Sequence, residues 1–137
     1  MRFNGLNHIG VAVRDIEKAK DFLKKNFESK LIYEGVSEKQ GIHFALVSWG
    51  ELKLELMAPI KGEGLIAEFI NQRGEGIHHL SFQVEDLQSI ASFFQEKGFK
   101  TIKQPSEIPG IHAMFIHPKS FFGILVEVFQ GIEESYV

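Results

Sequence analysis

Apolar and polar positions alternate with a period of two in two stretches of the chain, HIGVAV at 8–13 and HLSFQV at 79–84. Each alternation then gives way to apolar residues spaced three and four apart. These are Ile16, Ala19, Phe22 and Leu23 after the first stretch, and Leu87, Ile90, Phe93 and Phe94 after the second. The first pattern is typical of a half-buried strand and the second of an amphipathic helix. The sequence therefore predicts two strand–helix pairs, with Asp15 and Asp86 as helix N-caps.

The two stretches belong to an internal repeat, because placing residue 8 over residue 79 aligns HIGVAVRDIEKAKDFL with HLSFQVEDLQSIASFF. The first copy continues with the strand-like segments LIYEGV, HFALVSWG and LKLELMAP, and the second with TIKQ, AMFIHP and ILVEVFQ. Between the copies, KGEGLIAEFINQRGEG has glycines around a short helical pattern, which is typical of a connector. We predict a single α+β domain of two βαβββ modules, at about 1–62 and 75–132, joined by a connector helix at about 63–74.

Strand parity predicts which side chains share a face. In the first strand Ile9, Val11 and Val13 form the face expected to pack under the helix, which leaves His8 on the opposite face. The same parity places His79 opposite the apolar stripe of the second copy. A module with one helix covers only one face of its sheet, so we expect two modules to associate around a shared cavity. Both histidines would line that cavity.

Each module also has a glutamate in its final strand, Glu55 in LKLELMAP and Glu127 in ILVEVFQ. A carboxylate is expensive to bury there unless it is paired or bound to a metal. A pseudo-twofold relation between the modules would bring both glutamates together with His8 and His79. Two imidazoles and two carboxylates suit a divalent ion such as Zn, Ni, Co, Mn or Fe, with open positions for substrate. A single strand histidine is more often structural, but the repeated pair favours a metal site.

Composition narrows the function further. The 137 residues carry a net charge of −3 and no cysteine, and the charges of both signs are scattered. We expect neither nucleic acid nor a membrane as partner, no thiolate chemistry, and a cytoplasmic location, since there is no signal pattern or long apolar run. The 13 phenylalanines predict a core rich in Phe.

The paired modules, with one His and one Glu in each, resemble the vicinal oxygen chelate superfamily, which includes glyoxalase I, extradiol dioxygenases and antibiotic-resistance proteins. Within it, the segments GIHHLSFQVEDL, AEFINQRGEGIHH and FIHPKSFFGILVEVFQ are most similar to methylmalonyl-CoA epimerases. The resemblance implies an open, U-shaped, eight-stranded mixed sheet around the metal, and a homodimer. Its metal ligands fall on His8, Glu55, His79 and Glu127, the set that parity also indicates.

The implied reaction is removal and return of the α-proton of a chelated acyl-CoA, through an enolate whose charge a metal stabilises. Glu127 is the candidate base, with a role as ligand only as the alternative. Some epimerases have a second glutamate after the QG turn, where QGIHFALVSW has His43 and Phe44 instead. Lys119 and Ser120 of the HPKS segment are candidates to hold a substrate carboxylate or phosphate.

His112 is a candidate at the edge of the pocket, while His43, His78 and His117 are interpreted as structural. The alternative function is glyoxalase I acting on the hemithioacetal of methylglyoxal and glutathione, which the metal ligands alone do not separate from an epimerase. A non-catalytic antibiotic-binding protein gives no reason to bury two carboxylates, and an extradiol dioxygenase has no need of the second Glu.

Overall fold

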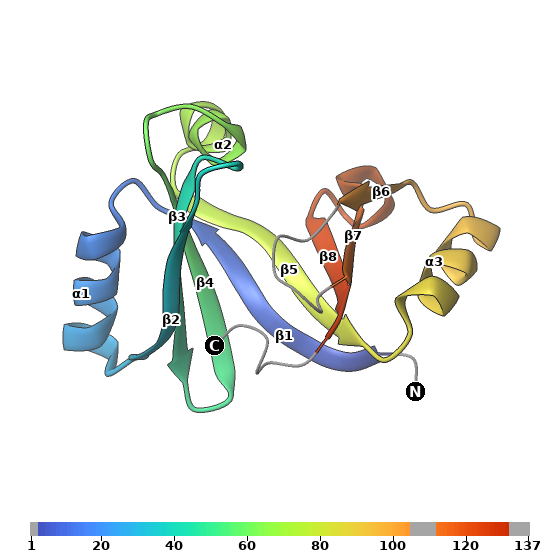
Figure 1. The fold of residues 1–137 in the computed structure, drawn as a ribbon, viewed down its shortest axis with the longest axis horizontal. Coiled ribbons are helices and arrows are strands. Elements are labelled where there is room, and N and C mark those ends of the chain that lie inside the picture. Colours follow the sequence, from blue (N-terminus) through green and yellow to red (C-terminus); the bar gives the residue numbers. More distant parts are fainter. Residues whose placement is uncertain (1–2, 105–111, 132–137) are drawn as a thin grey trace. The chain divides into compact units, whose positions relative to one another are not determined.

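The fold was obtained as a computed structural model that describes residues 3–104 and 112–131 (Figure 1). Its elements are β1 (Phe3–Ala12), α1 (Ile16–Phe27), β2 (Lys30–Ser37), β3 (Ile42–Trp49), β4 (Leu52–Pro59), α2 (Leu65–Arg73), β5 (Gly76–Val84), α3 (Leu87–Glu96), β6 (Thr101–Gln104), β7 (His112–Ile116), a short 3₁₀ turn η1 (Pro118–Ser120) and β8 (Leu125–Gln130). The order confirms two βαβββ repeats with a connector helix between them. The predicted outer ends of the modules, residues 1 and 132, lie outside the described residues.

The strands form one eight-stranded sheet with the hydrogen-bonded order β2-β3-β4-β1-β5-β8-β7-β6. β1 pairs in parallel with β4, and β5 pairs in parallel with β8, while β2, β3 and β4 and likewise β6, β7 and β8 are joined by antiparallel pairs. The sheet is therefore mixed, and the α+β class is confirmed. No helix in the described part of the chain is long and apolar enough to cross a membrane.

The chain divides into two compact units, and each is described by itself. In the unit His8–His78, α1 packs against one face of the strands (Figure 1). The core there consists of aliphatic residues, namely Val13, Ile16, Leu23, Ala45, Val47, Leu56 and Ala58. Val11 packs at its edge, so the predicted parity of the first strand is confirmed.

We expected no helix on the opposite face of this unit, but α2 packs there. Ile66 and Ile70 of α2 pack there against Ala12 and Met57. The apolar side of the connector helix thus covers the end of β1 and β4, and Ala12 is fully buried. The connector has a packing role in addition to joining the repeats.

The other unit combines the residues before His8 with those after His78. Its core places α3 over Val84, Met114, Ile116, Val126 and Val128, with Ile90 and Phe94 from the helix itself. Rings of Phe3, Phe82, Phe93, Phe99 and Phe121 pack around it. The prediction of a Phe-rich core is confirmed for this unit only, because no phenylalanine belongs to the buried set of the α1 core.

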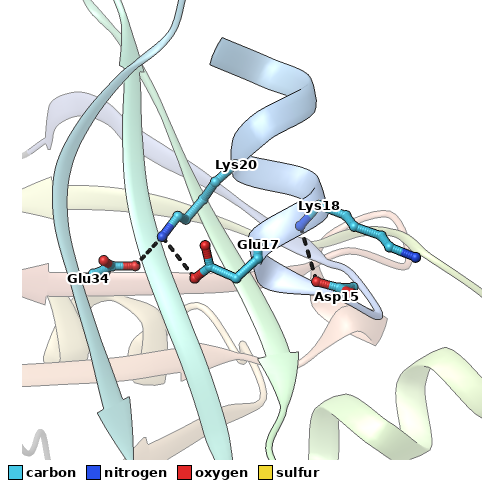
Figure 2. A network of polar contacts seen from close by, with 5 residues as sticks. All are labelled: Asp15, Glu17, Lys18, Lys20 and Glu34. Atoms are coloured by element: carbon cyan, nitrogen blue, oxygen red, sulfur yellow. Dashed lines mark hydrogen bonds and ion pairs between the residues drawn. The ribbon is translucent and has the colours of Figure 1, made fainter. Parts of the chain in front are cut away.

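Polar contacts anchor α1 at its start and along its length (Figure 2). The Asp15 carboxylate accepts a hydrogen bond of 3.1 Å from the Lys18 backbone N–H, as predicted for an N-cap. One turn further on, the Lys20 ammonium bonds Glu17 at 3.0 Å and Glu34 of β2 at 2.5 Å. Lys20 therefore ties the helix to the edge strand.

The repeat makes the two N-caps a matched pair, since Asp86 accepts from the Ser89 N–H at 3.2 Å. We expect Asp15→Ala and Asp86→Ala each to lower the free energy of unfolding by about 1 kcal/mol, because each leaves a helix N–H without its acceptor. Urea unfolding followed by circular dichroism measures this. Asp21→Ala is the control, because the exposed Asp21–Lys25 pair at 2.9 Å contributes little. Equal effects in all three variants would contradict the capping role.

Candidate metal and substrate site

His8 and Glu55 lie on neighbouring strands of the first unit. The His8 side chain is 1% exposed, and its Nε2 lies 3.8 Å from Oε2 of Glu55, which is 20% exposed. The parallel pairing of β1 with β4 sets Gly10 directly opposite Glu55. Because Gly10 has no side chain, this register places no polar side chain of β1 directly opposite the carboxylate.

His79 and Glu127 occupy the corresponding positions on β5 and β8. His79 is 4% exposed and Ser81 is fully buried. β5 pairs in parallel with β8 so that Ser81 stands opposite Glu127, and the Ser81 hydroxyl donates a hydrogen bond of 2.6 Å to Glu127 Oε1. The Glu127 side chain is thereby held by a strand neighbour that lies 46 residues earlier in the chain.

The two halves repeat one arrangement, with one difference. In each, the histidine comes two residues before the residue that pairs with the glutamate, so histidine and glutamate share a face of the sheet. The predicted parity of both ligand pairs is therefore correct. The difference is the residue between them, because Gly10 stands where Ser81 supplies a hydroxyl. Ser81 is two residues after His79 and so shares its parity, but its bond to Glu127 depends on a strand register that the sequence does not state.

In the unit His8–His78 the predicted ligands His8 and Glu55 form a close pair, 3.8 Å apart. In the other unit Glu127 Oε1 accepts from Ser81, and Ser81 comes two residues after His79. The assignment of the four side chains as metal ligands stays a prediction. Imidazole and carboxylate donors suit divalent first-row ions, and the identity of the ion does not follow from them.

The electrostatics of these side chains fit a metal site. Burial lowers the pKa of the His79 imidazole to about 4, so the ring is neutral at pH 7, the form that binds metals. Burial raises the pKa of the Glu127 carboxyl, and the hydrogen bond from Ser81 acts in the opposite direction. A carboxylate with a raised pKa is a better proton acceptor than an exposed one.

The other predicted site residues lie in different settings. Lys119 is exposed in η1, and the Ser120 hydroxyl accepts a hydrogen bond of 3.1 Å from the Lys100 N–H, so Ser120 braces this turn. His112 is exposed at the start of β7. His78 packs its ring against Phe69 with centroids 5.1 Å apart, which agrees with a structural role. The proposed roles of Lys119, Ser120 and His112 in substrate binding stay predictions.

The fold, together with one His and one Glu at matched positions of each repeat, is typical of one protein superfamily. The chain belongs to the glyoxalase/bleomycin resistance protein/dioxygenase superfamily, whose family profile matches residues 7–115. Within it, the chain is 30% identical over 130 residues to the mitochondrial methylmalonyl-CoA epimerase of Bos taurus, covering 92% of this chain and 74% of that protein.

Two further relatives extend the similarity. The chain is 31% identical to the ethylmalonyl-CoA/methylmalonyl-CoA epimerase of Cereibacter sphaeroides, covering 91% of this chain and 96% of that one. The crystal structure of methylmalonyl-CoA epimerase from Mycobacterium tuberculosis superposes with a TM-score of 0.85 at 28% identity, covering 96% of this chain and 91% of that one. The resemblance inferred from the sequence motifs is confirmed.

Proposed function

We propose that the protein is an epimerase of methylmalonyl-CoA or of a closely related 2-alkylmalonyl-CoA. The observation that carries the proposal is the similarity, over more than nine-tenths of the chain, to proteins named as epimerases of these substrates. The His and Glu pairs of the two repeats support it, because the reaction needs a site that stabilises negative charge beside a carbonyl group.

His8, Glu55, His79 and Glu127 are the proposed metal ligands. The closeness of His8 to Glu55 and the neutral state of His79 support this assignment. When bound, a divalent ion supplies Lewis acidity that stabilises the charge on the substrate oxygens as the α-proton leaves. The four side chains set the charge and orientation of the site.

Glu127 is the proposed base. Its raised pKa suits a group that accepts a proton, and the Ser81 hydroxyl restrains its orientation. β3, Ile42–Trp49, contains no carboxylate, and His43 and Phe44 stand where some epimerases have a second glutamate. We therefore propose that the proton returned to the opposite face of the α-carbon comes from Glu55 or from solvent.

The activity is tested by incubating one epimer of methylmalonyl-CoA with the metal-loaded protein and separating the epimers by chiral chromatography. Methylglyoxal with glutathione, offered in parallel, tests the glyoxalase alternative. Formation of the second epimer without turnover of methylglyoxal is the expected result. Turnover of methylglyoxal alone would overturn the proposal and retain the metal site. A homodimer and a cytoplasmic location stay predictions.

Ser81→Ala tests the hydrogen bond to Glu127. We expect the metal content to be retained and the rate of epimerisation to fall about 10-fold. Loss of a hydrogen-bond partner of a metal ligand typically lowers activity or metal affinity by about 10–100-fold. Ser81→Thr, which keeps a hydroxyl, should recover part of the loss. Ser37→Ala is a control, since Ser37 is also buried but accepts from the Gln40 N–H at 3.2 Å in the other unit. An unchanged rate in Ser81→Ala would show that the hydroxyl does not position Glu127.

A further inference from the structure

The turn that leads into β8 has an unusual backbone. Phe122 and Gly123 both have positive φ, 50° and 80°, and the Ile124 N–H donates to the Phe121 carbonyl at 2.8 Å. A tight turn with two such central residues favours Asn-Gly, because bulky side chains are strained in the left-handed region. A phenylalanine at the first position is therefore unfavourable for local structure.

The Phe122 side chain makes little contact with the core that would offset this backbone strain. It is 92% exposed, more than any other large hydrophobic residue in the described part of the chain. Its ring meets the edge of Phe121, with centroids 5.3 Å apart and planes at 74°, and Phe121 in turn packs against the α3 core. The Phe122 ring is thus presented outward, with Phe121 as its ring neighbour. Strain combined with an exposed aromatic ring points to a contact with a ligand.

Two lysines lie beside this turn. The His117 N–H donates to the Lys100 carbonyl at 2.8 Å, and the Lys119 N–H donates to His117 Nδ1 at 3.0 Å. Both lysines thus bond to His117 through their backbones, and the pKa of His117 is lowered by desolvation and by the charges of Lys100 and Lys119. Neither lysine takes part in the ion pairs formed among the described residues. Within the described part of the chain, the patch formed by these two lysines is cationic and has no carboxylate partner.

The turn is directly connected to the proposed site. Leu125, which follows it, pairs with His79, and Glu127 comes two residues later. Gly123 and Glu127 are four positions apart, which is at most roughly 13 Å at about 3.3 Å per position in an extended chain, within reach of an extended pantetheine arm.

We propose that Lys100, Lys119 and Phe122 form the subsite for the nucleotide end of the acyl-CoA. The ammonium groups pair with its phosphates, and the Phe122 ring stacks on the adenine. The choice of ligand rests on the proposed function, because an acyl-CoA carries both a planar base and phosphates at the end of a flexible arm. A second copy of the chain covering Phe122 is the competing explanation.

The test is calorimetric titration of the protein with CoA and with adenosine 3′,5′-bisphosphate. We expect Phe122→Asn to weaken binding of both about 10-fold, the scale of one base–aromatic contact, and Lys119→Glu to weaken it at least as much. Lys24→Glu, an exposed lysine of α1, is the charge control and should leave the affinity unchanged. Asn suits the left-handed turn, so Phe122→Asn should melt at no lower temperature than wild type, which excludes misfolding as the cause.

A kinetic experiment tests the nucleotide subsite separately from the proposed epimerase function. With methylmalonyl-CoA, Phe122→Asn should raise KM and leave kcat unchanged, whereas with methylmalonyl-pantetheine, which lacks the nucleotide, wild type and variant should be equal. CoA binding that depends on Phe122 in a protein without epimerase activity would refute the proposed function and keep the subsite. Absence of CoA binding, equal affinities in wild type and Phe122→Asn, or a loss of dimer in that variant by sedimentation would overturn the subsite.

Discussion

Replacing Glu127 by Gln is expected to reduce exchange of the substrate α-proton with solvent by at least about 100-fold. Gln keeps the size of the side chain and an oxygen that can accept the hydrogen bond from Ser81, but it cannot take up a proton. Metal content, measured by elemental analysis, should be retained or modestly reduced. NMR of methylmalonyl-CoA in deuterated water measures the exchange directly.

Glu55→Gln is the matched comparison, because Glu55 occupies the equivalent position of the first repeat opposite Gly10. If Glu127 is the base that removes the proton, exchange should survive better in Glu55→Gln than in Glu127→Gln. Loss of epimerisation with retained exchange in Glu55→Gln would identify Glu55 as the acid for the opposite face. Full exchange in Glu127→Gln would rule Glu127 out as the base.

His79→Ala is expected to lose the metal. Loss of a residue that only hydrogen-bonds to a metal ligand weakens metal binding by about 10–100-fold. Loss of a direct ligand should weaken metal binding by more than this and abolish epimerisation. The adjacent His78→Ala is the control. Its ring packs on Phe69, and strand alternation places it on the face opposite His79, so we expect the metal to stay bound and stability to fall slightly. Metal retained in His79→Ala, or lost in His78→Ala alone, would contradict the predicted parity of β5.

Much of the fold was predictable because the chain repeats itself. Period-two alternation identified the faces of β1 and β5, and the aspartates before each helix identified both N-caps. These are local properties, set by side chains a few residues apart. The same parity placed a histidine and a glutamate on one face in each repeat, which the strand registers confirm.

What the sequence could not provide depends on contacts between distant segments. The Ser81–Glu127 hydrogen bond joins residues 46 positions apart, and it requires a specific register between β5 and β8. The packing of α2 on Ala12 and Met57 was missed because a short helix between glycines reads as a connector. The number of phenylalanines predicts a Phe-rich core but does not show that Phe122 lies outside it, in an exposed turn.

The two repeats are not equivalent in their chemistry. Gly10 beside Glu55 and Ser81 beside Glu127 give the two carboxylates different surroundings on otherwise equivalent strand pairs. Burial raises the pKa of Glu127. This asymmetry supports different roles for the two glutamates, one as a ligand and one as a ligand that also moves a proton.

The central claim, proton transfer at the α-carbon of an acyl-CoA, is tested most directly by NMR of the cobalt-loaded protein with methylmalonyl-CoA in deuterated water. The account predicts loss of the α-proton signal, which stops when a chelator removes the metal and does not occur with Glu127→Gln. A persistent α-proton signal in the metal-loaded wild-type protein, under conditions in which methylglyoxal and glutathione are consumed, would contradict it.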